Sequence, residues 1–109
     1  IDPGIAIVEA CQWIKQVGID RPIQICFPSA FDNTYWRYYA MHYNETDPFM
    51  FNVIDGSSYA MGKFSITRRE ASLRNLYKRF LTEEETKGHT HDALSDARTQ
   101  GLLFLRMQR

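Results

Sequence analysis

Apolar and polar positions in the first part of the chain predict a helix followed by a buried strand. Apolar residues recur three or four positions apart, the spacing of one helix face, at Ile7, Val8, Cys11 and Ile14. Asp2 suits the N-cap of this helix, Pro3 its first position and Gly18 its end. The run over residues 22–27 is rich in β-branched residues and bounded by two prolines, which favours a strand.

The middle of the chain predicts further helical segments and one more short strand. Residues 28–33 suit a turn off the first strand, and residues 34–43 suit a helix rich in aromatic side chains. Residues 44–48 have the composition of a loop. Residues 51–55 suit a second short strand, and residues 57–64 suit one or two helical turns behind it.

Two longer helices are predicted in the last part of the chain. The first covers residues 66–81, and a charged loop over residues 82–88 follows it. The final helix starts near Thr90 or Asp92. We expect its buried positions to be Leu94, Ala97, Leu102 and Leu105.

Length and composition are those of an ordinary globular domain. The chain has 109 residues, which fits a single domain over residues 1–109. Its hydrophobic content of 44% and charged content of 24% exclude a disordered segment. The predicted order of elements, α-β-α-β-α-α, indicates an α/β domain with little sheet for its helices.

The charge and the cysteines of the chain indicate which cellular compartment and which partners to expect. The formal net charge is zero, so the overall field does not steer the chain toward nucleic acid. Cys11 and Cys26 lie in apolar runs with no second Cys or His at ligand spacing, and we expect buried thiols in a reducing compartment. The sequence has no signal peptide and no apolar run near the length of a membrane span. We therefore expect a cytoplasmic protein without a membrane partner.

His91 and Asp96 are the first candidates for chemistry. The histidine lies five residues before the aspartate, at the head of the final predicted helix. An aspartate on the first turn of a helix can bind a divalent cation, and a histidine just upstream can act as a general base toward water. The alternative interpretation is that His91 caps the helix, while Asp92 and Asp96 form the acidic first turn that the helix dipole favours.

Asp32 is the second candidate. It follows the first predicted strand and stands at the entry to the aromatic helix, and ligands of α/β sheets bind at the carboxyl ends of strands. In the alternative interpretation, Asp32 or Asn33 only caps that helix. Asp55 follows the second predicted strand, and we expect it to be structural or, at most, to support a metal ligand.

Three segments of this chain resemble the DEDDh-type 3′–5′ exonucleases, the family of ribonuclease-T-like and polymerase-proofreading exonucleases. The third motif of that family, His-x-Ala-x-x-Asp-Ala, is matched by His91, Ala93, Asp96 and Ala97. The second motif ends in Phe-Asp, matched by Phe31 and Asp32. The segments 27–32, 54–61 and 89–94 are similar to a bacterial branch of the ribonuclease-T-like enzymes.

The resemblance implies a ribonuclease-H-like exonuclease fold and a two-metal hydrolysis of phosphodiester bonds. By this resemblance His91 is the general base, and Asp96 and Asp32 are ligands of Mg²⁺ or Mn²⁺, of which the complete enzyme holds two. The implied substrate is a single-stranded or 3′-terminal nucleic acid, either RNA or DNA. The sequence does not identify the residues that bind this substrate.

The first motif of the family, Asp-x-Glu, is absent from this chain. No aspartate has a glutamate two positions later, and the three strands that precede the first helix in the family have no counterpart. Because the chain also begins with Ile1, we expect it to be the carboxyl-terminal two-thirds of the domain and inactive by itself. The missing part is expected on a removed segment, a second chain or a dimer partner. The alternative is a degenerate exonuclease fold that acts as a non-catalytic protein-interaction module.

Two groups of side chains allow more than one interpretation. The first comprises the aromatic residues Tyr35, Trp36, Tyr38, Tyr39 and Tyr43. These can stack on bases, but packing in a core or an interface is favoured. The second comprises the basic residues Arg68, Arg69, Arg74, Lys78 and Arg79. They are either a phosphate-contact face or a solvated helix face partly neutralised by nearby glutamates.

Overall fold

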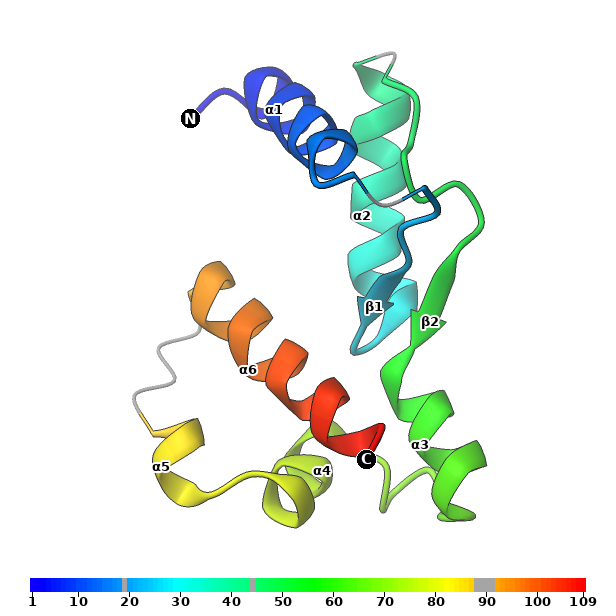
Figure 1. Ribbon diagram of the computed structural model, residues 1–109, viewed down its shortest axis with the longest axis vertical. Helices are drawn as coiled ribbons and strands as arrows, with labels where there is room; N and C mark the ends of the chain where they lie inside the picture. The colour runs from blue at the N-terminus through cyan, green and yellow to red at the C-terminus, as the bar shows by residue number, and fades with distance from the viewer. Residues whose placement is uncertain (19, 44, 88–91) are drawn as a thin grey trace. The chain divides into compact units, whose positions relative to one another are not determined.

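A computed structural model describes residues 1–18, 20–43, 45–87 and 92–109. In this described part the chain forms six helices and two short strands (Figure 1). It divides into two compact units, Ile1–Ile54 and Asp55–Arg109. We describe each unit by itself.

Unit 1 contains both strands. Its elements are α1 (Pro3–Gln16), β1 (Gln24–Cys26), α2 (Ser29–His42) and β2 (Val53–Asp55), of which the last residue, Asp55, already belongs to unit 2. The two strands pair in a parallel two-stranded sheet, and α2 lies in the connection between them (Figure 1). Parallel strands need such a crossover, because a tight turn cannot bring the chain back in the same direction. The two predicted strands are confirmed, and the mixture of helices with a parallel sheet agrees with the expected α/β class.

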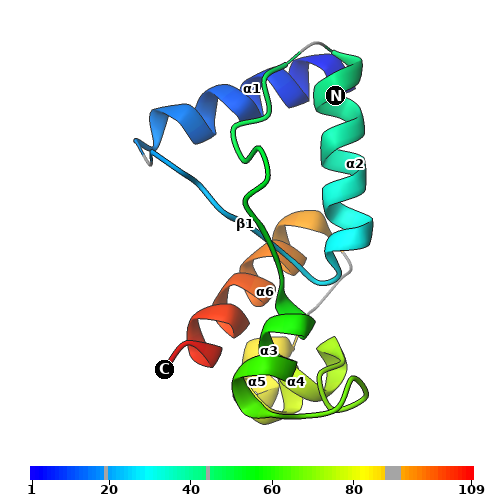
Figure 2. The ribbon, with the colours of Figure 1, turned by 90° about the vertical axis from the view of Figure 1, so that its right-hand side faces the viewer.

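Helix α1 starts where the sequence predicts. The Asp2 carboxylate accepts hydrogen bonds from the backbone N–H groups of Gly4 at 2.8 Å and Ile5 at 3.1 Å. This satisfies donors that have no partner inside the helix. Figure 2 shows α1 running across the end of α2. A Cβ at Gly4 would meet the Tyr43 ring at 2.9 Å, so a larger residue here would displace the ring.

The core of unit 1 is small and includes both cysteines. Its buried apolar side chains are Ile7, Cys11, Cys26, Phe27 and Ala40. The predicted burial of Cys11 and Cys26 is therefore confirmed. Burial also raises the pKa of the Cys11 thiol, because the thiolate would lose its hydration.

Unit 2 is helical. Its helices are α3 (Gly56–Phe64), α4 (Leu73–Phe80), α5 (Glu83–Thr86) and α6 (Ala93–Met107). Helices α4 and α6 pack against each other. The buried apolar side chains are Ala60, Ala71, Leu76, Leu81, Leu103, Phe104 and Met107. Outside residues 19, 44 and 88–91, no helix is both long enough and apolar enough to cross a membrane.

The predicted helix over residues 66–81 is wrong in its first half. The Glu70 carboxylate accepts hydrogen bonds from the Thr67 backbone N–H at 3.2 Å and hydroxyl at 2.9 Å, which closes a local turn. The α-helix begins only at Leu73, where the Ser72 hydroxyl accepts from the backbone N–H of Asn75 at 3.3 Å. Side-chain hydrogen bonds to the backbone thus compete with the helical pattern that the apolar residues suggest.

The predicted loop over residues 82–88 is also wrong, because α5 occupies part of it. Thr82 and Glu85 form a reciprocal capping box, in which each side chain accepts from the backbone N–H of the other. Glu85 also forms a two-pronged ion pair with Arg106 of α6, at 2.6 and 3.1 Å. A threonine followed three positions later by a glutamate is the sequence signature of this cap, so the start of α5 could have been predicted from the sequence.

The predicted inward face of the final helix is wrong. Leu94 is 59% exposed and Leu105 is 60% exposed, Ala97 is exposed and Leu102 is half-buried. The buried face carries Leu103, Phe104 and Met107 instead. Both faces satisfy helical spacing, and only the packing of α6 on α4 distinguishes them.

The Glu85–Arg106 pair predicts a pH-dependent stability. Hydrogen bonds from Arg106 hold the pKa of Glu85 at about 2, below its ordinary value of 4.5. A carboxyl with a lowered folded-state pKa contributes stability above the ordinary value and loses it as the pH falls toward 2. The free energy of unfolding should therefore fall over this range in the wild type, and less in Glu85→Gln, as measured by urea unfolding. Glu84→Gln is the matched control, and an identical pH profile in all three proteins would contradict the assignment.

Candidate catalytic site

Asp32 lies in the first turn of α2, where the helix dipole favours a carboxylate. The helix begins at Ser29, inside the predicted turn over residues 28–33, and its N-cap residue is Pro28, without a side-chain cap. The interpretation of Asp32 or Asn33 as the N-cap is therefore wrong. The Asn33 amide donates a hydrogen bond of 2.8 Å to the side-chain oxygen of Gln24, which ties this turn to β1. The exposed Asp32 carboxylate thus stands on a fixed turn beside the strand.

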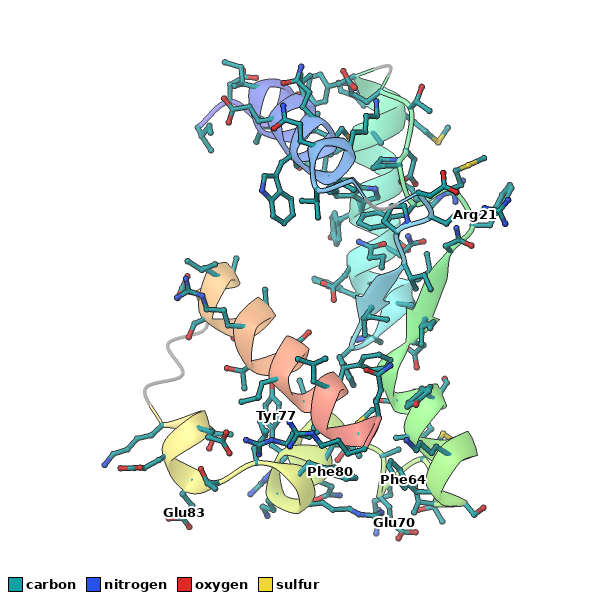
Figure 3. All side chains as sticks on the ribbon, in the orientation of Figure 1. Arg21, Phe64, Glu70, Tyr77, Phe80 and Glu83 are labelled. Atoms are coloured by element: carbon teal, nitrogen blue, oxygen red, sulfur yellow. The ribbon has the colours of Figure 1, made fainter. Side chains whose placement is uncertain are left out.

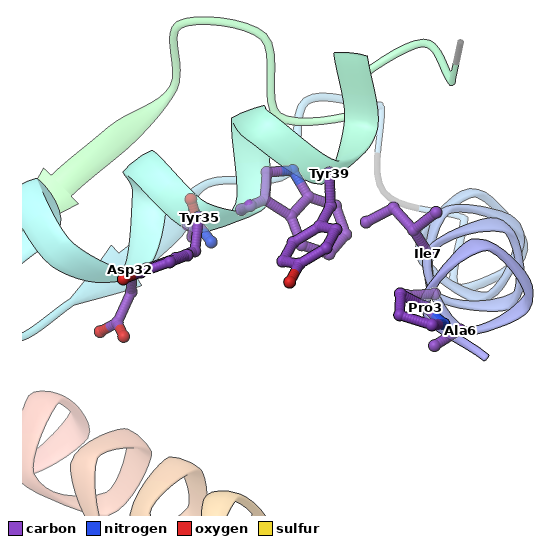
Figure 4. Close-up of a pocket in the computed structure, with 9 residues that line it drawn as sticks. Pro3, Ala6, Ile7, Asp32, Tyr35 and Tyr39 are labelled. Carbon is purple, nitrogen blue, oxygen red and sulfur yellow. The ribbon is translucent and has the colours of Figure 1, made fainter. Parts of the chain in front are cut away.

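A groove between α1 and α2 borders Asp32. It has a volume of about 390 Å³ and is largely apolar. Figure 4 shows Asp32 at one end, with Tyr35 and Tyr39 following along α2 and Pro3 and Ala6 on α1. Small-molecule sites have a similar size and combine apolar walls with few polar groups. The groove could not be predicted from the sequence, because it forms only where α1 and α2 pack together.

The aromatic side chains of α2 differ in how deeply they are packed. Trp36 is half-buried, and its indole N–H donates to the Asp47 carboxylate at 2.9 Å. Tyr43 is also half-buried and stacks on Tyr39. Tyr35 is 54% exposed and Tyr38 is 58% exposed, so these two rings do not pack in the core, and their packing in an interface stays a prediction. Helical spacing alone could not separate the packed rings from the exposed ones.

Asp96 lies in the first turn of α6, and Asp92 is the N-cap. The Asp92 carboxylate accepts from the backbone N–H groups of Leu94 at 3.1 Å and Ser95 at 3.3 Å. Asp96 is half-buried and near Tyr77 of α4. Burial and the negative charge of Asp96 raise the pKa of Tyr77, while a hydrogen bond with Gln100 lowers it. The proximity of Tyr77 to Asp96 could not be predicted from the sequence, because α4 and α6 meet only in the folded unit.

The predicted general base lies outside the described residues. His91 and His89 both belong to residues 88–91, so their roles stay predictions. Asp32 belongs to unit 1 and Asp96 to unit 2, and each is described within its own unit. In the described ranges, which omit both histidines, no three His, Cys, Asp or Glu side chains gather as a metal site would require. The predicted metal site is therefore neither confirmed nor contradicted.

Asp55 has the structural role that the sequence predicts. It is the N-cap of α3, and its carboxylate accepts hydrogen bonds from the Ser58 backbone N–H at 2.9 Å and from the Ser58 hydroxyl at 2.7 Å. The chain therefore passes from β2 into α3 without a linker.

Comparisons with protein-family models, with curated proteins and with solved structures find no match to this chain. The family assignment therefore stays a prediction that rests on the motifs.

The geometry of α6 predicts different effects for its two acids. Asp92→Ala should lower the free energy of unfolding by about 1 kcal/mol, because two backbone N–H groups lose their acceptor. Asp92→Ser should retain most of the stability, since serine is also a good N-cap. Asp96→Asn, which leaves the cap in place, is the matched comparison. Urea unfolding followed by circular dichroism measures all three, and a loss for Asp92→Ser as large as for Asp92→Ala would contradict the capping role.

Proposed function

We propose that this chain is the carboxyl-terminal part of a 3′–5′ exonuclease that hydrolyses phosphodiester bonds with two divalent metal ions. The observation that carries the proposal is the match of His91, Ala93, Asp96 and Ala97 to the third DEDDh motif. The match of Phe31 and Asp32 to the second motif, in the expected order, supports it. The parallel βαβ unit around α2 is compatible with the fold that the motifs imply.

The proposed metal ligands have suitable chemistry. Asp32 and Asp96 are carboxylates in first helical turns, and neither is the N-cap of its helix. Carboxylate oxygens are the ligands that Mg²⁺ and Mn²⁺ prefer. Two carboxylates are too few for two ions, so the proposal requires the Asp-x-Glu pair from polypeptide outside these 109 residues.

The proposed reaction assigns one task to each residue. Bound Mg²⁺ or Mn²⁺ would lower the pKa of the attacking water and neutralise charge on the phosphate. His91 would accept the proton from that water as a general base, a role that imidazole suits near neutral pH. Asp96 would hold the ion that activates this water, and Asp32 would complete the acidic site directly or through water.

A second candidate is a non-catalytic module that docks a protein partner. The exposure of Phe31, Tyr35, Tyr38 and Met41 on α2 favours it, because contiguous exposed apolar side chains often mark interaction surfaces. The DNA sequence upstream of the codon for Ile1 separates the two candidates. An in-frame Asp-x-Glu on an apolar strand supports the enzyme, and its absence supports the module.

The exonuclease proposal predicts that His91→Ala lowers turnover without loss of metal binding. In the complete enzyme the loss should be about 10²- to 10⁴-fold, the usual contribution of a general base. Turnover is measured with a 5′-labelled oligonucleotide and Mn²⁺, as shortening from the 3′ end. Mn²⁺ binding is measured separately by titration.

His89→Ala is the matched control, because Leu94 and not a carboxylate lies five residues after His89. This variant should keep most of its turnover. Unchanged turnover in His91→Ala would refute the assignment, and so would an equal loss in both variants.

A further inference from the structure

We propose that the basic segment, residues 63–79 of unit 2, binds the phosphate backbone of a single-stranded nucleic acid. This inference rests on the proposed exonuclease function and adds a contact surface for its substrate.

Charge is distributed unequally between the two units. Unit 1 has three basic and six acidic residues, whereas unit 2 has ten basic and seven acidic residues. The net charge of zero is therefore the sum of −3 and +3. The excess lies in the basic segment, whose only acidic residue is Glu70. Its six basic residues, all exposed, are Lys63, Arg68, Arg69, Arg74, Lys78 and Arg79.

The one carboxylate of the segment is engaged locally. Glu70 accepts hydrogen bonds from the backbone N–H and the hydroxyl of Thr67, and these hydrogen bonds lower its pKa. Glu70 therefore stays ionised and leaves a net charge of +5 on the segment. The ion pair described in this unit, Arg106 with Glu85, lies outside the segment. Among the described residues no ion pair of the segment is found, so its cations are available to an external anion.

Two of the cations lie over aromatic rings, and one of them, Arg79, also interacts electrostatically with Glu70. The Arg79 guanidinium lies 4.6 Å from the centre of the Phe64 ring and 5.0 Å from that of Phe80. These two rings, whose centres are 5.1 Å apart, are labelled in Figure 3. The Lys63 ammonium lies 5.7 Å from the Phe64 ring and 5.9 Å from the Tyr59 ring. Stacking of this kind orients a cation without neutralising its charge. Guanidinium groups fixed in this way suit the forked hydrogen bonding of phosphate.

Two further cations line a groove beside a tyrosine ring. Arg74 and Lys78 are four positions apart on α4 and border a groove of about 600 Å³ together with Tyr77 and the carboxylate of Glu83. The two cations outnumber the one acid in this lining. Cations that follow a groove with exposed ring surface are typical of single-strand binding, in which phosphates meet the cations and bases meet the rings. Tyr77 also lies near Asp96, so α4 connects this groove to a proposed metal ligand.

The alternation of cations with aromatic rings favours a single-stranded nucleic acid over an acidic protein. An acidic protein needs only the positive charge, whereas an unstacked base also uses the face of an aromatic ring, here that of the half-buried Tyr77 in the groove. Single strands expose such bases and duplexes do not.

The test measures binding by the 109-residue chain in EDTA, so that no metal or catalysis contributes. A fluorescent single strand of about 12 nucleotides, as RNA and as DNA, is titrated between about 50 and 200 mM salt. If all six cations contact phosphates, log affinity falls with log salt with a slope of about −4. Arg74→Gln/Lys78→Gln should reduce this slope to about −3 and weaken binding roughly tenfold or more.

Arg98→Gln/Arg109→Gln is the matched control, because it removes two exposed cations of the same unit outside the segment. It should change affinity less than the segment variant, and circular dichroism shows whether each variant is folded. Arg68→Gln/Arg69→Gln provides a second segment variant, in the turn before α4. Equal losses in segment and control variants would overturn the proposal, as would equally tight binding of a polyglutamate peptide. Binding without hydrolysis by the complete enzyme would contradict the exonuclease function but support this surface.

Discussion

The unpaired backbone N–H groups at helix starts are the constraint on which the rest of this structure depends. Five of the six described helices begin at a residue whose side chain accepts from these groups: Asp2, Asp55, Ser72, Thr82 and Asp92. Such caps decide where each helix begins, even where apolar spacing suggests another start. The caps also distinguish two groups of aspartates. Asp55 and Asp92 are used as caps, whereas Asp32 and Asp96 lie one turn further along their helices.

The neutral charge of the chain conceals two units of opposite sign. Unit 1 is acidic and contains Asp32, and unit 2 is basic and contains both Asp96 and the basic segment. A phosphodiesterase needs both kinds of surface, because carboxylates hold metal ions while cations hold the substrate backbone. The overall charge therefore does not bear on the proposed nucleic-acid binding, because it averages two units of opposite sign. The local distribution of charge is more informative, because salt at about 0.1 M limits the field of each charge to about 10 Å.

Each unit buries few large side chains and leaves many apolar ones exposed. In unit 1 the rings of Tyr35 and Tyr38 remain accessible, and in unit 2 Leu94 and Leu105 do. This exposure agrees with both functional candidates, since stacking bases and docking proteins use the same kind of surface. The match of His91 and Asp96 to the third DEDDh motif is the reason that we propose the enzyme before the module.

The sequence by itself determined the short strands, the start of α1, a structural role for Asp55 and the burial of both cysteines. These features depend on local chemistry: β-branched runs, capping side chains and short apolar segments. It also supplied the motif match on which the functional proposal rests. Only the tertiary structure decided which face of α6 is buried, which rings of α2 are exposed and that Tyr77 lies near Asp96. Helical spacing allows several faces to turn inward, and the packing partner selects one of them.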